Sequence, residues 1–290
     1  TTRLRTFLRS AVLATAASMT MSLDAYLARS HGRLQSLGEV LPPMHIVIGN
    51  EAADPDSCVC AIAMAAALDA SLADTDALVA PLVLVPRADF KLQLDRVHLL
   101  RRAGLVGAGD GPLWTPKHVS FGDEIDLAAL AARAPSLSLH LVDHNKLSAN
   151  LAALGPHVAS IVDHHAEEGL YMETASGEAR RVELGIGSCA SLVAERLEGL
   201  APALLADHRV STLLLGAILL DTVNLNPDAK AQKAREAAVA DSLLARCAPS
   251  LGLAGAPGDA RAAFFDELLA VKADQSLLLA FPTADLLRQD

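Results

Sequence analysis

Short apolar runs alternate with longer amphipathic or alanine-rich stretches along most of this chain. The runs are rich in Ile, Val and Leu, and several end at a Gly, Pro or Asp, as buried strands do. Strands separated by helices in this way form parallel sheets through right-handed crossovers. The pattern therefore predicts an α/β fold in which helices flank a parallel sheet. The predicted strands are 44–49, 81–85, 137–142, 157–162 and 180–184.

Stretches with helical periodicity lie between and after these runs. Residues 57–72 are rich in alanine, and Ser57 is an expected N-cap. Residues 89–102 place their apolar side chains on one stripe, and residues 210–222 are strongly apolar. Further helices are predicted at 127–133, 147–154, 188–197, 231–246 and 259–273.

The two ends of the chain differ in composition from its centre. Residues 1–23 contain arginine but no acidic residue, which predicts either a mitochondrial presequence or a frayed helix. Residues 24–250 are predicted to form the main domain. Residues 252–258 hold Gly, Ala and Pro, so 251–290 is predicted to be a linker and the start of a second unit. A cytoplasmic location is expected, with a mitochondrial one as the alternative.

Composition and net charge argue against several classes of function. The 290 residues carry a formal net charge of −10, which argues against binding to nucleic acid or to an anionic membrane. The apolar runs are shorter than the ~20 residues of a membrane span, so we expect a soluble protein. The four cysteines lack zinc-site spacing and predict buried thiols in a reducing compartment.

Acidic and imidazole side chains follow the predicted strands. Asp54 and Asp56 lie in the turn after the first run, Asp143 follows a later run directly, and Asp221 ends an apolar helix. Taken alone, these residues could serve turn chemistry, helix capping or solvation of a helix end. Brought together, they would bind hard or borderline divalent cations. Two such cations can hold the attacking and leaving oxygens of a phosphoryl group.

Two further sequence patterns contain residues that could bind a metal ion or an anion. His164 and His165 are adjacent at a strand end, so one can ligate a metal while the other faces phosphate and delivers a proton. The alternative is a solvated surface pair. Residues 187–191 place Gly and Ser before a helix, which offers either an anion site or plain capping.

In this order, the motifs resemble those of the DHH phosphoesterase superfamily. Within it the chain looks most like the eukaryotic exopolyphosphatases, which are related to family II inorganic pyrophosphatases. The resemblance runs from about residue 24 to the end of the chain. The matching segments are GNEAADPDS, VPRADF, LVDHN, VDHH, GSCASLV and LLLGAILLDTVNL.

The resemblance implies a two-cation site. It assigns Asp54 and Asp56 to one metal each, makes Asp143 the bridging ligand, and adds His164 and Asp221 to the second metal. Asn50 stands where related pyrophosphatases have His and would be a weaker ligand. The implied cofactors are two divalent cations, Mg or Mn, with Co or Zn as options. The implied catalytic residues are His165 and Asp143, and the implied substrate-binding residues are His165, Ser188, Arg87 and Asn145.

The activity implied is metal-dependent removal of terminal orthophosphate from inorganic polyphosphate. The alternatives are an inorganic pyrophosphatase and a catalytically weak binding or regulatory protein on the same scaffold. The expected partner is polyphosphate or pyrophosphate, with oligomeric state left open. Members of the family continue into a second associated domain, which we expect to be absent or only begun here. Without its basic groups, turnover by these 290 residues is expected to be poor.

Overall fold

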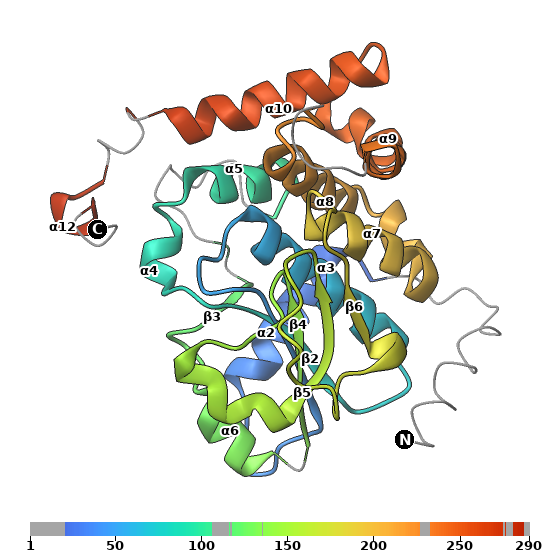
Figure 1. Ribbon diagram of the computed structural model, residues 1–290. Helices are drawn as coiled ribbons and strands as arrows, with labels where there is room; N and C mark the ends of the chain where they lie inside the picture. The colour runs from blue at the N-terminus through green and yellow to red at the C-terminus, as the bar shows by residue number, and fades with distance from the viewer. Residues whose placement is uncertain are drawn as a thin grey trace.

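A six-stranded, all-parallel sheet forms the centre of the molecule (Figure 1). The computed structural model describes residues 21–105, 116, 118–134, 136–226, 233–274, 276 and 281–286. The strand order β3-β2-β1-β4-β5-β6 confirms the predicted α/β fold. The strands are β1 (Met44–Ile48), β2 (Leu78–Val83), β3 (Ser120–Phe121), β4 (Leu137–Val142), β5 (Val158–Asp163) and β6 (Arg180–Val182).

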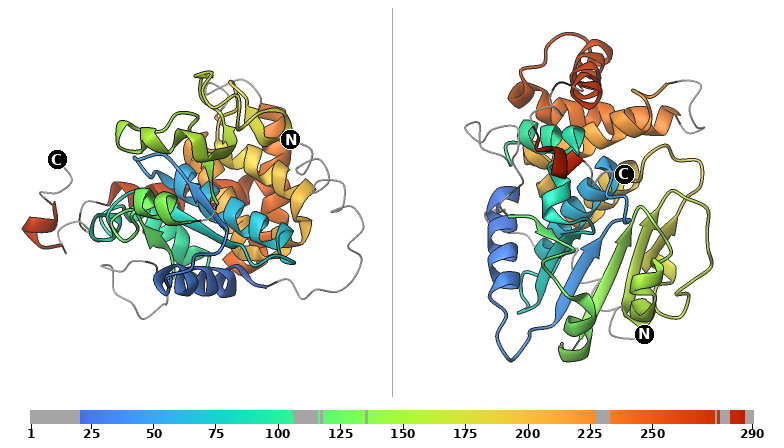
Figure 2. Two further views of the ribbon diagram at one scale, coloured as in Figure 1. Left: turned by 90° about the horizontal axis from the view of Figure 1, so that it is seen from below. Right: turned by 90° about the vertical axis from the view of Figure 1, so that its left-hand side faces the viewer.

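Helices cover both faces of this sheet (Figure 2). The α-helices are α2 (Leu23–Gln35), α3 (Pro55–Ser71), α4 (Arg87–Phe90), α5 (Leu94–Arg102), α6 (Leu127–Arg133), α7 (Cys189–Leu200), α8 (His208–Asp221), α9 (Lys233–Leu251), α10 (Pro257–Ala273) and α12 (Thr283–Leu286). The 3₁₀ segments are η2 (Ala149–His157), η3 (Gly177–Ala179) and η4 (Pro202–Ala206). Among the described helices, none has both the length and the apolar character needed to cross a lipid bilayer.

Two apolar cores form because successive strand residues point to opposite faces of the sheet. Val47, Val142 and Val162 face the larger core, which also contains residues of α3, α5 and α7 to α10. Ile46 and Leu139 face the smaller core, to which α6 and η2 contribute. The strands are thus buried on both faces, which explains their nearly continuous apolar sequence.

The strand order reverses at β1, which pairs with β2 on one side and with β4 on the other. In parallel α/β sheets, ligands bind beyond the carboxyl ends of the strands at such a reversal. Strand β1 and the strand before Asp143, β4, pair in parallel over residues 44–48 and 137–141. The loops after β1 and β4 are therefore neighbours.

Three local predictions are wrong. The expected helix 89–102 is split into α4 and α5, because the N–H groups of Leu92 and Gln93 bond to carbonyls three residues back and form a turn between the two helices. Asp54, and not Ser57, is the N-cap of α3, and Pro55 occupies the first helical turn, where its missing N–H costs nothing. The expected helix 147–154 is the 3₁₀ segment η2, which contains Pro156.

The C-terminal helices extend the larger core. Helix α9 continues to Leu251, five residues beyond the predicted end, and α10 begins at Pro257. Phe264 and Leu268 of α10 are fully buried. The Glu267 carboxylate, also on α10, contacts His98 and Arg102 of α5. Helix α10 thus belongs to the same core, while a domain boundary at residue 250 stays a prediction. The expectation for residues 1–23 falls almost entirely outside the described residues.

Helices α5 and α8 cross closely at Gly216. A Cβ there would lie 2.3 Å from Leu99 Cδ1, and Leu99 is only 1% exposed, so its side chain could move only by displacing buried neighbours. Gly216→Ala should therefore destabilise the fold by about 1–3 kcal/mol despite the better helix propensity of alanine. Gly199→Ala, in α7 with open space around it, is the matched control and should be neutral or stabilising by up to ~1 kcal/mol. Urea unfolding of both variants would measure this, and equal stability of the two would contradict the packing argument.

Candidate metal centre

The loops after β1, β4 and β5 and the end of α8 meet at the carboxyl edge of the sheet. Asp143 follows β4 directly and has a φ of 61°, a left-handed conformation that Asp tolerates better than most residues. Its N–H donates to the carbonyl of Val162 on β5 at 2.9 Å. This backbone turn directs the Asp143 carboxylate across the edge of the sheet toward its neighbours.

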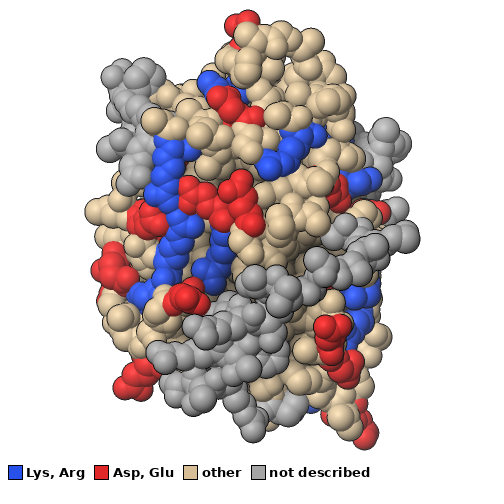
Figure 3. All heavy atoms as spheres, turned by 90° about the vertical axis from the view of Figure 1, so that its right-hand side faces the viewer, with Lys and Arg blue, Asp and Glu red and all other residues tan. Residues whose placement is uncertain are grey.

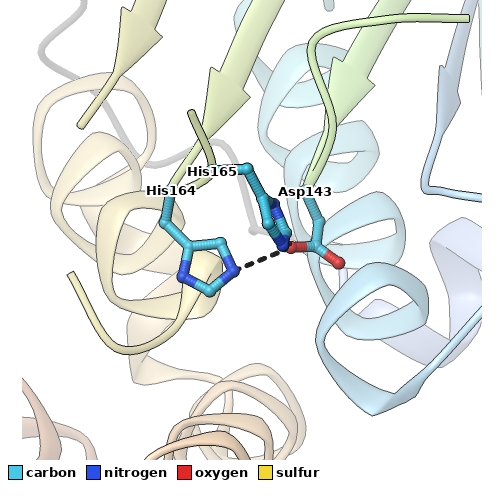
Figure 4. Close-up of side chains that lie close together, drawn as sticks. All are labelled: Asp143, His164 and His165. Carbon is cyan, nitrogen blue, oxygen red and sulfur yellow. Dashed lines mark ion pairs between the residues drawn. The ribbon is translucent and has the colours of Figure 1, made fainter. Parts of the chain in front are cut away.

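Two imidazoles approach that carboxylate. His164 Nε2 lies 3.1 Å from Asp143 Oδ1, and His165 Nδ1 lies 3.7 Å from the same oxygen. Figure 4 shows both rings turned toward Asp143. The potential ligand atoms of the three residues lie within 4.8 Å of one another, a spacing that one metal ion could occupy.

A second group of potential ligands shares His164. Asp56 Oδ2 lies 3.9 Å and Asp221 Oδ2 lies 4.0 Å from His164 Nε2. Asp56 is buried, whereas the Asp221 side chain is 37% exposed at the end of α8. The geometry thus brings together Asp56, Asp143, His164 and Asp221, the residues that the sequence pattern selects, with His165 beside them.

The crowding perturbs the protonation of these groups. Burial raises the pKa of Asp143 to about 6, and the charges of Asp56 and Asp54 add to this rise. Burial and the charge of Asp56 raise the pKa of Asp221 to about 8. Burial alone would lower the pKa of His164, but Asp143 and Asp56 outweigh it and raise the pKa to about 9. The metal-free cluster therefore retains protons at neutral pH that a cation would displace.

A divalent cation suits this set of donors. Asp143 Oδ1 is buried and accepts no well-oriented hydrogen bond, although His164 Nε2 is close. Such an oxygen is costly unless a positive charge or a donor faces it. Carboxylate oxygens with one or two imidazoles are ligands that hard and borderline divalent cations accept.

Asp56 is held by the N-terminus of α7. Its Oδ2 accepts the Cys189 N–H at 2.7 Å, and its Oδ1 accepts the Ala190 N–H at 2.8 Å and the Ser188 hydroxyl at 3.0 Å. The helix-terminal N–H groups that the sequence offered to an anion are thus occupied by the protein's own carboxylate. Ser188 is fully buried in this arrangement, and its predicted contact with substrate stays a prediction.

Asn50 and Ser57 hold Asp143 from the side of β1. Asn50 Nδ2 donates to Asp143 Oδ2 at 2.9 Å, and its Oδ1 accepts the Ala53 N–H. The Ser57 hydroxyl donates to the same Asp143 oxygen at 2.7 Å. Asp54 caps α3 by accepting the Ser57 N–H at 2.8 Å. Metal ligation by Asn50 and Asp54 stays a prediction, because neither belongs to the two ligand groups.

Asp163 and Asn145 support the His165 side of the centre. Asp163 is fully buried, and its Oδ1 lies 2.8 Å from His165 Nδ1 and accepts the His164 N–H. Asn145 donates to Asp163 Oδ2 at 2.5 Å and accepts the Glu168 N–H. Asn145 therefore orders the turn after β5, while its predicted contact with substrate is untested.

Arg87 stabilises the edge of the sheet near β3. Its guanidinium pairs with Glu124, donates to the carbonyls of Pro116 and Val119, and lies over the ring of Phe121. It would have to leave these partners to reach phosphate, so substrate binding by Arg87 stays a prediction.

Three supporting residues escaped the sequence interpretation: Ser57, Asp163 and Glu236. The sequence pattern predicts Ser57 as a helix cap, and at the end of the strand before Asp163 it points to the two histidines rather than to Asp163. Glu236 lies in α9, where it accepts N–H groups of the loop before α7. Asp163 could have been found, because a carboxylate directly before two histidines is well placed to orient them.

The model of the DHH family N-terminal domain matches residues 45–220. The chain belongs to the DHH family. Exopolyphosphatase PRUNE1 of Rattus norvegicus is 40% identical over 192 residues, which cover 66% of this chain and 38% of that protein. A putative exopolyphosphatase of Schizosaccharomyces pombe is 31% identical over 194 residues, covering 63% of this chain and 46% of that protein. The alignments thus span less than half of either relative.

A solved structure of an exopolyphosphatase-related protein from Bacteroides fragilis is also similar. It aligns with a TM-score of 0.48 and 12% sequence identity, covering 90% of this chain and 62% of that one. The cluster of acidic and imidazole ligands lies in and just beyond the part of the chain that matches the family, and it could hold metal ions.

Protons and cations should compete for this centre. Because the pKa values of Asp143, Asp221 and His164 are raised, Mn²⁺ affinity should increase as the pH rises from about 6 to about 9. Each proton released contributes roughly tenfold per pH unit. Calorimetry in buffers of different ionisation enthalpy would count the protons. Affinity that is flat over this range would show that the three groups bind no cation.

Proposed function

We propose that this chain has exopolyphosphatase activity and uses two divalent cations, Mg²⁺ or Mn²⁺, to release orthophosphate from the ends of inorganic polyphosphate. The observation that supports this most is the convergence of Asp56, Asp143 and Asp221 on His164 in a chain of the DHH family. The similarity to proteins named exopolyphosphatase favours polyphosphate as the substrate.

Each residue has a role that follows from its position. His164 is shared by the two ligand groups, and Asp143, whose Oδ1 lies 3.1 Å from His164 Nε2, could bridge both cations, with Asp56 and Asp221 beside one of them. Bound cations would supply a nucleophilic water and neutralise the phosphoryl oxygens. The His165 side chain is 55% exposed, so it can reach a phosphoryl group while Asp163 fixes its ring.

Three arginines in the part of the chain that the structure describes are already paired with glutamates. Arg180 pairs with Glu167, Arg181 with Glu183 and Glu195, and Arg235 with the same two glutamates. Basic and acidic side chains are interleaved on the face shown in Figure 3, and no broad basic patch is visible there. The cations would therefore carry most of the charge that holds the terminal phosphate.

Removal of the bridging carboxylate tests the mechanism. Asp143→Asn preserves the size of the side chain, and Asn also tolerates the left-handed backbone. Phosphate release with Mn²⁺ should fall by ~10³-fold or more, because the position shared by both cations is lost. Asp74→Asn, at an exposed position, is the matched control and should keep wild-type activity. A variant at Asp143 that retains full activity would rule out this centre.

The choice of substrate separates the proposed activity from its alternatives. With polyphosphate of defined length, orthophosphate should accumulate while the remaining chain shortens, and pyrophosphate should be a poor substrate. Malachite-green assay and gel analysis of the chain length would measure this. Rapid cleavage of pyrophosphate alone would favour an inorganic pyrophosphatase. Tight Mn²⁺ binding without cleavage of either substrate would favour a binding or regulatory protein.

A further inference from the structure

Glu236 is a charged side chain buried beside the metal centre, although it belongs to neither of the two ligand groups. It lies in the first turn of α9 and is 3% exposed. Its Oε1 accepts the Gly187 N–H at 2.8 Å, the Ser188 N–H at 3.2 Å and the Ser191 hydroxyl at 3.3 Å. Burial of a carboxylate is costly unless such donors surround it, so its place in the fold depends on this loop.

The loop that Glu236 binds also orients His164. The carbonyl of Ile186 lies 3.0 Å from His164 Nδ1 and accepts its N–H. This carbonyl and the Gly187 N–H belong to one peptide group, so Glu236 and His164 bind its two ends. Hydrogen bonds in such a chain polarise one another, and the negative charge of Glu236 strengthens the Ile186 carbonyl as an acceptor. With Nδ1 protonated and engaged, His164 keeps Nε2 directed toward the aspartates, where a cation would displace the Nε2 proton.

The packing around Gly187 couples the same peptide to Asp221. A Cβ on Gly187 would lie 2.6 Å from Thr222 Cγ2 and 3.0 Å from Glu236 Oε1, so only glycine permits this approach. Thr222 follows Asp221 directly, and its hydroxyl donates to Ile218 within α8. The Glu236 contact therefore lies where the loop before α7, which orients His164, packs against the end of α8, which carries Asp221.

We propose that Glu236 is a positioning residue, which fixes the tautomer and direction of His164 for a divalent cation through the Ile186–Gly187 peptide group. A metal-ligating histidine commonly donates its second N–H to a carboxylate or a carbonyl. Here the carboxylate acts through a carbonyl, and it comes from a helix outside the matched segment 45–220. This inference rests on the proposed cation site but not on the identity of the substrate.

Three variants of the full 290-residue chain test the role. Glu236→Ala should weaken Mn²⁺ binding about 10–100-fold, the usual effect of removing a partner that orients a ligand. Glu236→Asp keeps the charge and should bind Mn²⁺ more tightly than Glu236→Ala. Glu236→Gln keeps a hydrogen-bond acceptor without the charge, and its Mn²⁺ affinity should be several-fold below that of the wild type. Glu198→Ala, exposed on α7, is the matched control and should bind Mn²⁺ as the wild type does. Calorimetric titration measures the affinity, and thermal unfolding measures stability separately.

A second readout follows the histidine itself. With Zn²⁺ bound, ¹⁵N NMR of the wild type should show His164 with Nδ1 protonated, and Glu236→Ala should lose that single-tautomer signature. Unchanged Mn²⁺ affinity in Glu236→Ala, with a lower melting temperature, would overturn the proposal and leave Glu236 a purely structural residue. If Glu236→Ala does not fold, unchanged affinity in Glu236→Gln overturns it instead. A wild type that binds Mn²⁺ but cleaves no polyphosphate would refute the proposed function, while the affinity ratios would still decide this inference.

Discussion

Negative charge concentrated around one imidazole is the constraint on which the rest of this structure depends. Asp56, Asp143 and Asp221 all lie within about 4 Å of His164 Nε2. Burial raises the pKa values of Asp143 and Asp221, and the like charges at these short distances raise them further. A divalent cation would convert this repulsion into attraction, which is why the cluster indicates a metal centre better than any single residue does.

The parallel sheet makes this concentration possible. Parallel strands place all their carboxyl ends at one edge, and the reversal of strand order opens that edge between β1 and β4. The supporting contacts then come from elements that are distant in sequence. The N-terminus of α7 supplies N–H groups to Asp56, and Ser57 and Asn50 supply donors to Asp143. These donors hold the carboxylates in place without neutralising them, which leaves the charge available for cations.

The parallel sheet and several of the potential metal ligands can be predicted from the sequence for one physical reason. The apolar runs mark where strands end, and a residue at a strand end in a parallel sheet necessarily lies at the edge where sites form. Asp143 and His164 could be placed in this way, whereas Asp221 lies at the end of the apolar helix α8. The role of Ser57 could not, because its hydroxyl reaches Asp143 only once β1 and β4 are paired. Glu236 was missed for the same reason, since its partners lie 45 to 49 residues earlier in the chain.

The residues assigned to substrate show where resemblance alone is weakest. Arg87, Asn145 and Ser188 were expected at the phosphate, yet each is bonded within the protein: Arg87 to Glu124, Asn145 to Asp163 and Ser188 to Asp56. A sequence motif shows which residue type occupies a position, but not what its side chain contacts. The same residue type can either bind substrate or hold another side chain of the site in place. Burial distinguishes the two, because a group that must meet a charged substrate needs exposure as well as proximity. By that criterion His165, more than half exposed and fixed by a buried carboxylate, is the best placed of the four to touch phosphate.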